Sequence, residues 1–322
     1  MTATDVLLFG KDAEYYREHL GAEFPDLRLH LAQDNGAIAG RAAESQVLVS
    51  MAPAVNAATV RALPRLQWVQ AMTTGVDNLL IMPELPPGVA ITRVRGIHGP
   101  QMSELAILDM MLLVRDFPAV LRNQEKHRWE RWPQKLLVGR TAVILGVGSI
   151  SEELAPRCKA FGMRVIGISG RSAPPPGFDA MMPRERLHEA AALADFLVLL
   201  IPYTPETHNI IDARLLSAMR PGSFLVNLAR GNVVDEDALA EALRAGTIAG
   251  AALDVFAQEP LPAESPLWDV PNLMITPHIG GMSDTYAEQA LPTLRQNLAD
   301  FVQGGAGALK DRVERPARAG TA

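Results

Sequence analysis

Residues 140–161 read RTAVILGVGSISEELAPRCKAF, and this stretch decides the fold. An apolar strand over 140–145 runs into a glycine turn, and the turn leads into a helix over 152–161. The turn consists of Gly146, Val147, Gly148, Ser149, Ile150 and Ser151. Where a strand, a glycine turn and a helix follow one another in this way, backbone N–H groups of the turn and the positive end of the helix dipole can hold a pyrophosphate. Ser151 stands where the pattern usually has a third glycine, a position that serves close packing of helix on strand, and we expect serine to be tolerated there.

On both sides of this turn, short apolar runs alternate with segments of helical pattern. A first series of runs occupies 5–10, 27–32, 46–50, 66–71 and 90–94. A second series occupies 140–146, 163–169, 196–201, 223–229, 249–256 and 273–276. Such alternation indicates parallel strands with crossover helices, and the nearly uninterrupted apolar runs of the second series indicate a sheet covered on both faces. We predict an α/β protein with two doubly wound parallel-sheet domains.

Composition narrows the function classes. The chain has 322 residues, of which 48% are hydrophobic and 20% charged, and its net charge is -6. This charge disfavours a nucleic-acid partner, and no stretch approaches the ~20 apolar residues of a membrane helix. The N-terminus lacks a cationic leader, and one cysteine, Cys158, cannot form an intramolecular disulfide. We expect a soluble cytoplasmic protein without a metal site, because the seven histidines show no ligand spacing.

The end of the second strand of this series predicts the cofactor. NAD-binding versions of the motif carry an acidic residue about 20 residues after the glycine turn, which binds the ribose 2′-hydroxyl. Here the segment reads Ser169, Gly170, Arg171 and Ser172, with no acid. Arg171 suits a 2′-phosphate, with Ser169 and Ser172 as hydroxyl donors. We predict NADP(H) as the preferred cofactor, with NAD(H) possible; the alternative is a solvated loop arginine.

Three ionisable residues follow ends of strands in the second series: Arg230, Glu259 and His278. Ligands of open parallel sheets bind at these carboxyl ends, so the three side chains can converge. An arginine can clamp a carboxylate, and a histidine can protonate a carbonyl oxygen as hydride arrives. A neighbouring carboxylate orients the imidazole and raises its pKa. Singly, each residue also fits an ordinary structural role.

Five segments of the sequence resemble motifs of the D-isomer-specific 2-hydroxyacid dehydrogenase family. The resemblance is nearest to the glyoxylate/hydroxypyruvate reductase branch of that family. They read VGRTAVILGVGSI (138–150), LIPYTPETHNIID (200–212), LVNLARGNVVDEDAL (225–239), AALDVFAQEPLPAESPLW (251–268) and NLMITPHIGG (272–281). The resemblance spans about residues 66–302. It implies that Arg230 binds the substrate carboxylate, that His278 is the general acid/base and that Glu259 is its partner. It also implies a first-domain loop with Thr74 and Gly75 that meets the carboxylate.

The resemblance further implies a set of cofactor-binding residues beyond the glycine turn. Asp254 would bond the nicotinamide carboxamide. The remaining residues expected to line the cofactor are Pro202, Thr207, Leu228, Ala229, Arg230, His278 and Gly280. Family members are commonly homodimers joined through the coenzyme domain, and a polar stretch with Trp129 and Trp132 fits such a contact.

These observations lead to one functional prediction with two alternatives. We expect an oxidoreductase that transfers hydride from NADPH to a small 2-oxo acid, such as glyoxylate or hydroxypyruvate, and forms the D-2-hydroxy acid. One alternative is an NAD-preferring D-2-hydroxyacid dehydrogenase with other substrates. The other is a cofactor-sensing binding protein, since some relatives act as corepressors.

The motif positions also predict the domain boundaries. A Rossmann-type cofactor domain, 100–287, is expected to be inserted into a flavodoxin-like substrate domain formed by 1–99 and 288–322. The long helical pattern near 283–302 would pack back on the first domain. The residues after Gly304, rich in Gly, Ala and Arg, are expected to fray.

Overall fold

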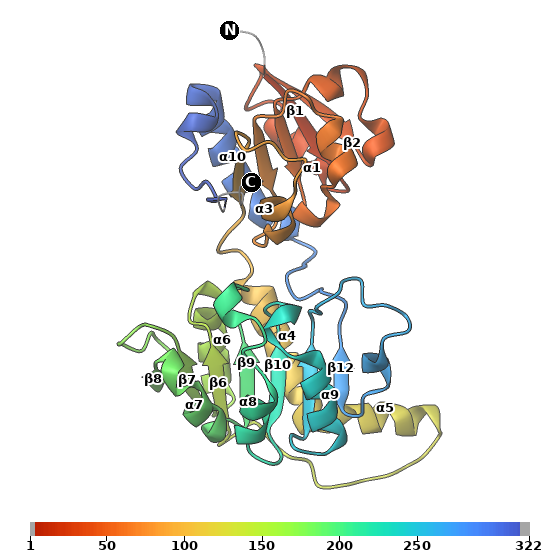
Figure 1. The fold of residues 1–322 in the computed structure, drawn as a ribbon, viewed down its shortest axis with the longest axis vertical. Coiled ribbons are helices and arrows are strands. Elements are labelled where there is room, and N and C mark those ends of the chain that lie inside the picture. Colours follow the sequence, from red (N-terminus) through yellow and green to blue (C-terminus); the bar gives the residue numbers. More distant parts are fainter. Residues whose placement is uncertain (1–3, 316–322) are drawn as a thin grey trace, which may run out of the picture. The chain divides into compact units, whose positions relative to one another are not determined.

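The computed structural model describes residues 4–315 and divides into two compact units (Figure 1). Unit 1 runs to Ile97 and resumes at Ser283, and unit 2 spans His98–Met282. Each sheet is parallel throughout, so two parallel α/β sheets, as expected from the alternating apolar runs, are confirmed. Within the described range, no helix has the length and apolar character needed to cross a membrane.

Unit 1 is built on a five-stranded parallel sheet in the order β2-β1-β3-β4-β5. Its strands are β1 (Thr4–Phe9), β2 (Leu27–Ala32), β3 (Val47–Ser50), β4 (Trp68–Ala71) and β5 (Ala90–Arg93). Its α-helices are α1 (Ala13–Leu20), α2 (Ala57–Arg61), α3 (Asp77–Ile81) and α10 (Tyr286–Gly304). Successive side chains of a strand point to opposite faces, so Val6 and Leu8 pack in the cluster with α1 and α10, whereas Leu7 packs on the other face with Val60 and Leu79.

Helix α10 returns the chain to the sheet of unit 1. The ring of Phe301 stacks on Trp68 with 5.1 Å between centroids, and Asn297 Nδ2 donates to Gln70 Oε1 at 2.7 Å. The Tyr286 hydroxyl donates to the carbonyl of Met72 at 2.7 Å. This helix therefore completes the sheet's second layer, as the sequence pattern predicted.

The expectation that the chain frays after Gly304 is wrong for residues 305–315. Leu309 is buried, Val313 N–H donates to the carbonyl of Ile91 at 2.8 Å, and the Arg315 guanidinium donates to the carbonyl of Pro86 at 2.8 Å. Carbonyls of the edge strand β5 and of the loop before it accept these bonds and hold a segment that has no apolar period of its own. The remainder of the expected tail, 316–322, lies outside the described residues.

Unit 2 is built on a seven-stranded parallel sheet in the order β12-β11-β10-β9-β6-β7-β8. Its strands are β6 (Thr141–Leu145), β7 (Arg164–Ile168), β8 (Ala180–Met182), β9 (Phe196–Leu199), β10 (Phe224–Asn227), β11 (Gly250–Leu253) and β12 (Leu273–Ile275). Its α-helices are α4 (Gly99–Val114), α5 (Phe117–Glu125), α6 (Ser149–Ala160), α7 (Leu187–Leu193), α8 (Ala213–Ala218) and α9 (Glu236–Arg244). Helices α4 and α6 cover one face, and α7, α8 and α9 cover the other (Figure 1). The strand order reverses between β6 and β9, which is where such sheets bind ligands.

Candidate active site

The glycine turn between β6 and α6 has the conformation that its sequence requires. Gly146 has φ +104°, and a Cβ there would lie 2.6 Å from the carbonyl oxygen of Leu200. Only glycine fits this position, because its neighbour is backbone that cannot rotate away. A Cβ on Gly148 would meet nothing within 4 Å, so open space lies beside the amino end of α6. The turn therefore offers both the room and the helix end that a pyrophosphate needs.

Ser151 shows why serine replaces the third glycine. Its side chain is fully buried, and its hydroxyl accepts from Gly148 N–H at 2.8 Å and donates to the Gly148 carbonyl at 2.9 Å. The hydroxyl thus closes the turn on itself while the small side chain still allows α6 to approach the sheet. The substitution is tolerated because no polar group is left unpaired.

Arg171 lies at the carboxyl end of β7, in the exposed segment 169–172. Its backbone N–H donates to Ser169 Oγ at 3.1 Å, and its guanidinium Nη1 donates to Glu152 Oε1 at 2.6 Å. The arginine is therefore already engaged by a carboxylate from the first turn of α6. Glu153, the next residue, pairs with Arg157 at 2.6 Å.

The three ionisable residues expected at strand ends come together in unit 2. His278 Nδ1 and Glu259 Oε2 are 2.6 Å apart, and Glu259 Oε1 accepts from Phe256 N–H at 2.9 Å. Arg230 follows β10 and lies near enough for its positive charge to act on both His278 and Glu259. The backbone of His278 has φ +53°, an uncommon conformation for a residue other than glycine. Backbone strain of this kind concentrates at functional sites.

The electrostatics of this group suit proton transfer. The hydrogen bond to Glu259 raises the pKa of His278 above its ordinary value, against the opposing effects of burial and of Arg230. Burial alone would raise the pKa of Glu259, but the hydrogen bonds from His278 and Phe256 and the positive charges of His278 and Arg230 lower it overall. The side chain of His278 remains 49% exposed, so its free ring nitrogen can reach a ligand.

Asp254 fixes the loop that carries His278. It follows β11, is almost fully buried, and accepts from Thr276 Oγ1 at 2.6 Å, Ile279 N–H at 2.9 Å and Gly280 N–H at 2.8 Å. Three donors satisfy this buried carboxylate and pin both sides of His278. Asp254 therefore positions the loop, whatever further contact it makes with a cofactor.

The loop of Arg230 is braced by Asn227 and packs against the loop that leads to Glu259. Asn227 Nδ2 donates to the carbonyl of Arg230 at 3.0 Å, and Asn227 Oδ1 accepts from Ala229 N–H at 3.0 Å. Gly231 lies directly against the backbone of Phe256 and Ala257, such that a Cβ would fall 1.8 Å from the carbonyl carbon of Phe256. The arginine and the glutamate are thus set by one packed contact.

Thr74 and Gly75 belong to unit 1 and follow β4. The Thr74 hydroxyl donates to the carbonyl of Val94 at 2.8 Å, and Thr73 Oγ1 donates to the carbonyl of Gly75 at 2.7 Å. Arg93 Nη1 donates to the carbonyl of Thr74 at 3.1 Å. These bonds hold the loop in one shape, and its part in substrate binding stays a prediction.

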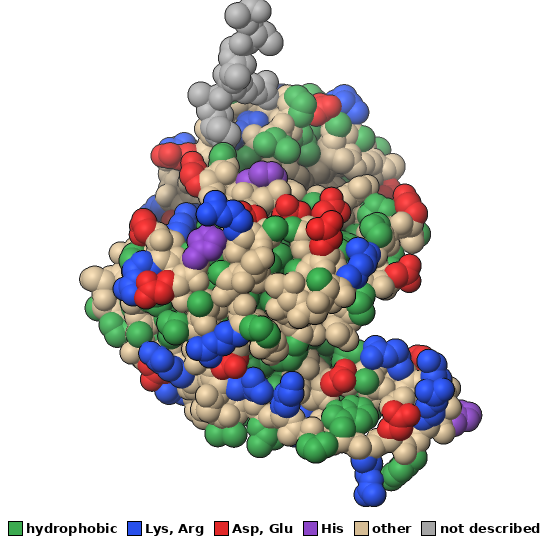
Figure 2. Space-filling view, turned by 60° about the horizontal axis from the view of Figure 1, so that its bottom comes forward, with side chains coloured by type: hydrophobic (Ala, Val, Ile, Leu, Met, Phe, Trp, Pro, Cys, Tyr) green, Lys and Arg blue, Asp and Glu red, His purple; other side chains and the backbone are tan. Residues whose placement is uncertain are grey.

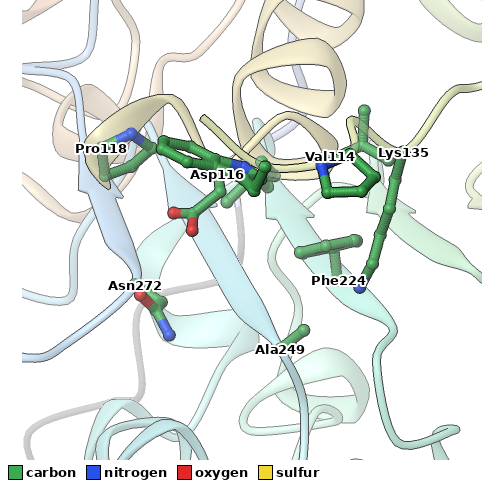
Figure 3. A pocket seen from close by; sticks show the side chains of 10 residues that line it. Val114, Asp116, Pro118, Lys135, Phe224, Ala249 and Asn272 are labelled. Atoms are coloured by element: carbon green, nitrogen blue, oxygen red, sulfur yellow. The ribbon is translucent and has the colours of Figure 1, made fainter. Parts of the chain in front are cut away.

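A cavity of about 200 Å³ lies in unit 2 away from these residues (Figure 3). Phe224, Ala249 and Asn272, which line it, stand at the amino ends of β10, β11 and β12, whereas the candidate catalytic residues follow the carboxyl ends. Trp132 and Lys135 cover it from the segment after α5. The cavity therefore does not mark the chemistry.

The visible surface carries mixed charge. Figure 2 shows basic and acidic side chains intermixed across the face it presents. Over residues 4–315, no three His, Cys, Asp or Glu side chains gather in a way that could hold a metal ion.

Comparison with known proteins identifies the family. The family model for the D-isomer specific 2-hydroxyacid dehydrogenase NAD binding domain matches residues 107–280, just over half of the chain. This chain belongs to the D-isomer specific 2-hydroxyacid dehydrogenase family. The D-3-phosphoglycerate dehydrogenase of Mycobacterium tuberculosis is 31% identical over 83% of this chain but matches along 52% of its own length. The chain thus spans about half the length of such curated relatives.

Two solved structures resemble this 2-hydroxyacid dehydrogenase family member over nearly its whole length. A D-isomer specific 2-hydroxyacid dehydrogenase family protein from Aeromonas salmonicida has a TM-score of 0.87 and 34% identity, covering 98% of this chain and 100% of its own. The NADPH-dependent glyoxylate/hydroxypyruvate reductase of Sinorhizobium meliloti, solved with NADP and sulfate, has a TM-score of 0.79 and 28% identity, covering 97% and 98%.

The other residues that the family resemblance assigned to the cofactor also follow strand ends of unit 2. Thr207 is buried, and its hydroxyl donates to the carbonyl of Pro202 at 3.0 Å, which closes the loop after β9. Leu228 and Ala229 are buried directly after β10, and Gly280 is buried between Asp254 and α4. These positions are compatible with a cofactor along the carboxyl edge of the sheet, and their contacts with it stay a prediction.

Three further ionisable side chains of this dehydrogenase family member have shifted pKa values, and two of them, Glu236 and Asp109, were not identified as functional candidates from the sequence. The His98 ring lies against Gly281, and burial and the charge of Arg230 lower the pKa of His98. Glu236 accepts from Ala257 N–H at 2.7 Å, and burial raises its pKa. Asp109 is buried inside α4 with no hydrogen-bond partner for Oδ2, and burial, together with the charge of Asp254, raises its pKa to about 7.

Proposed function

We propose that the protein is an NADPH-dependent oxidoreductase that reduces a small 2-oxo acid to the D-2-hydroxy acid. The observation that carries this proposal is the His278–Glu259 pair, 2.6 Å apart and beside Arg230, in the same unit as the dinucleotide turn. A proton donor, its carboxylate partner and a cation for an anionic substrate are the groups that such a reduction needs.

Each side chain has a defined part in the proposed reaction. Arg230 holds the substrate carboxylate and polarises the neighbouring carbonyl. The protonated ring nitrogen of His278 that faces away from Glu259 gives its proton to the carbonyl oxygen, so an alcohol forms without a free alkoxide. Glu259 accepts the Nδ1–H hydrogen bond and stabilises the imidazolium. The bound cofactor supplies the hydride.

Unit 2 fits the cofactor, and we assign it the cofactor-binding role. The open space beside Gly148 at the start of α6 suits a pyrophosphate, and Arg171 at the end of β7 suits a 2′-phosphate. The NADP-bound Sinorhizobium meliloti enzyme supports this reading. Unit 1, with Thr74 and Gly75, is assigned to the substrate.

Arg171→Ala tests the cofactor assignment. Loss of a charge-assisted bond to phosphate costs about 1.5–3 kcal/mol, so we expect the KM for NADPH to rise about 10- to 150-fold. The KM for NADH should stay within about twofold, because NADH has no 2′-phosphate. Steady-state kinetics with both cofactors on both proteins measures this, and an unchanged KM for NADPH would refute the assignment.

A panel of 2-oxo acids tests the substrate class. We expect glyoxylate and hydroxypyruvate to drive NADPH oxidation, as the name of the Sinorhizobium meliloti enzyme suggests. D-3-phosphoglycerate with NAD⁺ or NADP⁺ belongs in the same panel, because relatives bear that activity in their names. If no member of the panel turns over while the cofactor still binds, the proposed substrate class is refuted.

We also propose a homodimer joined through unit 2. Large apolar side chains are exposed on α4, α5 and the segment that follows, including Leu108 (50%), Leu121 (51%) and Trp129 (91%). Such a surface is typical of an interface. Light scattering of the purified protein should give about twice the chain mass of 34.8 kDa, and a monomer mass at micromolar concentration would contradict the proposal.

A further inference from the structure

We propose that Glu152 sets the strength of the preference for NADP(H), because it competes with the 2′-phosphate for Arg171. The inference rests on the proposed function, in which Arg171 binds that phosphate. It adds a second residue, from a different element, to the determinants of cofactor choice.

The carboxylate that competes is already in contact with the arginine. Arg171 Nη1 and Glu152 Oε1 are 2.6 Å apart, and the two side chains come from the neighbouring segments that follow β6 and β7. Both side chains are about half exposed, at 52% and 41%, so the pair can open without disrupting the core. A phosphate that approaches the guanidinium must displace this carboxylate or share the donors with it.

The effect should distinguish the two cofactors. NADP(H) brings a phosphate that carries nearly two negative charges at neutral pH, and Glu152 repels this group at the same time as it occupies its donor. NAD(H) has hydroxyls at this position and leaves the ion pair intact. Removing the charge of Glu152 should therefore tighten NADP(H) binding and leave NAD(H) binding nearly unchanged.

The magnitude follows from the exposure of the pair. Exposed ion pairs are weak, so an arginine released from one should gain about fivefold in affinity for the phosphate, which corresponds to about 1 kcal/mol. The ion pair is thus too weak to abolish NADP(H) binding, but it is strong enough to change the ratio of the affinities for NADP(H) and NAD(H).

The neighbouring residue provides a matched control. Glu153 lies in the same turn of α6, carries the same charge and is also paired with an arginine, Arg157, at 2.6 Å. Glu153→Gln removes one negative charge near the same helix end without releasing Arg171. Any general electrostatic gain for an anionic cofactor will also appear in Glu153→Gln, so only a change in the ratio of the two Kd values beyond that seen in Glu153→Gln is assigned to the release of Arg171.

Direct binding measurements separate the possibilities. Isothermal titration calorimetry with NADP⁺ and NAD⁺, without substrate, is carried out on the wild type, Glu152→Gln, Glu153→Gln, Arg171→Ala and the double variant Arg171→Ala/Glu152→Gln. We expect Glu152→Gln to lower the Kd for NADP⁺ about fivefold, with the Kd for NAD⁺ within twofold of wild type. In the Arg171→Ala background, the same substitution should change the ratio of the two Kd values by less than twofold.

The outcomes of this experiment distinguish failure of the inference from failure of the proposed function. If Glu152→Gln leaves the ratio of the two Kd values unchanged, or if Glu153→Gln changes it equally, the inference about Glu152 is overturned while Arg171 can still bind the phosphate. If Arg171→Ala leaves the Kd for NADP⁺ unchanged, the cofactor assignment itself is overturned, and the inference falls with it.

Discussion

Replacing His278 with alanine should lower kcat for reduction of the 2-oxo acid by about 10²- to 10⁴-fold, the usual contribution of a general acid. The side chain is half exposed and contributes little to the core, so the variant should fold as the wild type does. Steady-state NADPH oxidation with the best substrate of the panel measures the loss, and the melting temperature serves as the folding control. A kcat near the wild-type value would remove His278 from the proposed mechanism.

The pH dependence of the same reaction gives a second test of the His278–Glu259 pair. Reduction needs the protonated imidazole, so the rate should fall as pH rises through the pKa of His278. The bond to Glu259 raises that pKa, so Glu259→Gln should lower it. The fall of kcat/KM on the alkaline side of the pH profile, which we call the alkaline limb, should then occur at lower pH. The glutamine can still accept from Phe256 N–H, so the loop should keep its shape. A limb that stays in place, or moves to higher pH, would contradict the assignment.

Features that depend on a few adjacent residues could be predicted from the sequence. The glycine turn was recognised because its spacing is local and because Gly146 must adopt a conformation that only glycine tolerates. The convergence of Arg230, Glu259 and His278 was predictable for a different reason. Each residue follows a parallel strand, and all such ends meet at one edge of the sheet.

Features that depend on packing between distant segments could not be predicted. Strand β8 has only three residues, which are apolar but too few to be distinguished from a loop by their pattern. The segment 305–315 carries no signal for its attachment, which depends on acceptors of β5. The pairing of Glu152 with Arg171 could be found only from the coordinates, because nothing in either segment specifies the partner.

Gly231 illustrates how such a packed contact becomes a functional requirement. An added Cβ would lie 1.8 Å from the carbonyl carbon of Phe256 and 2.1 Å from the nitrogen of Ala257, both backbone atoms. No rotamer change can relieve this overlap, so the 256–257 backbone must move away from Arg230. The N–H of Phe256 in that backbone donates the hydrogen bond that orients Glu259. Arg230 and Glu259 should therefore both be displaced relative to His278.

Gly231→Ala should therefore lower kcat/KM by at least about 100-fold, since a misplacement of about 1 Å in a catalytic group can cost that much. It should also cost about 1–3 kcal/mol of unfolding free energy, the usual effect of overpacking, and thermal unfolding of the purified variant measures this. Gly88→Ala is the matched control, because a Cβ on Gly88 meets nothing within 4 Å and its activity and melting temperature should match the wild type. If Gly231→Ala keeps kcat/KM within threefold of wild type at an unchanged melting temperature, the placement of Arg230 and Glu259 does not depend on this contact.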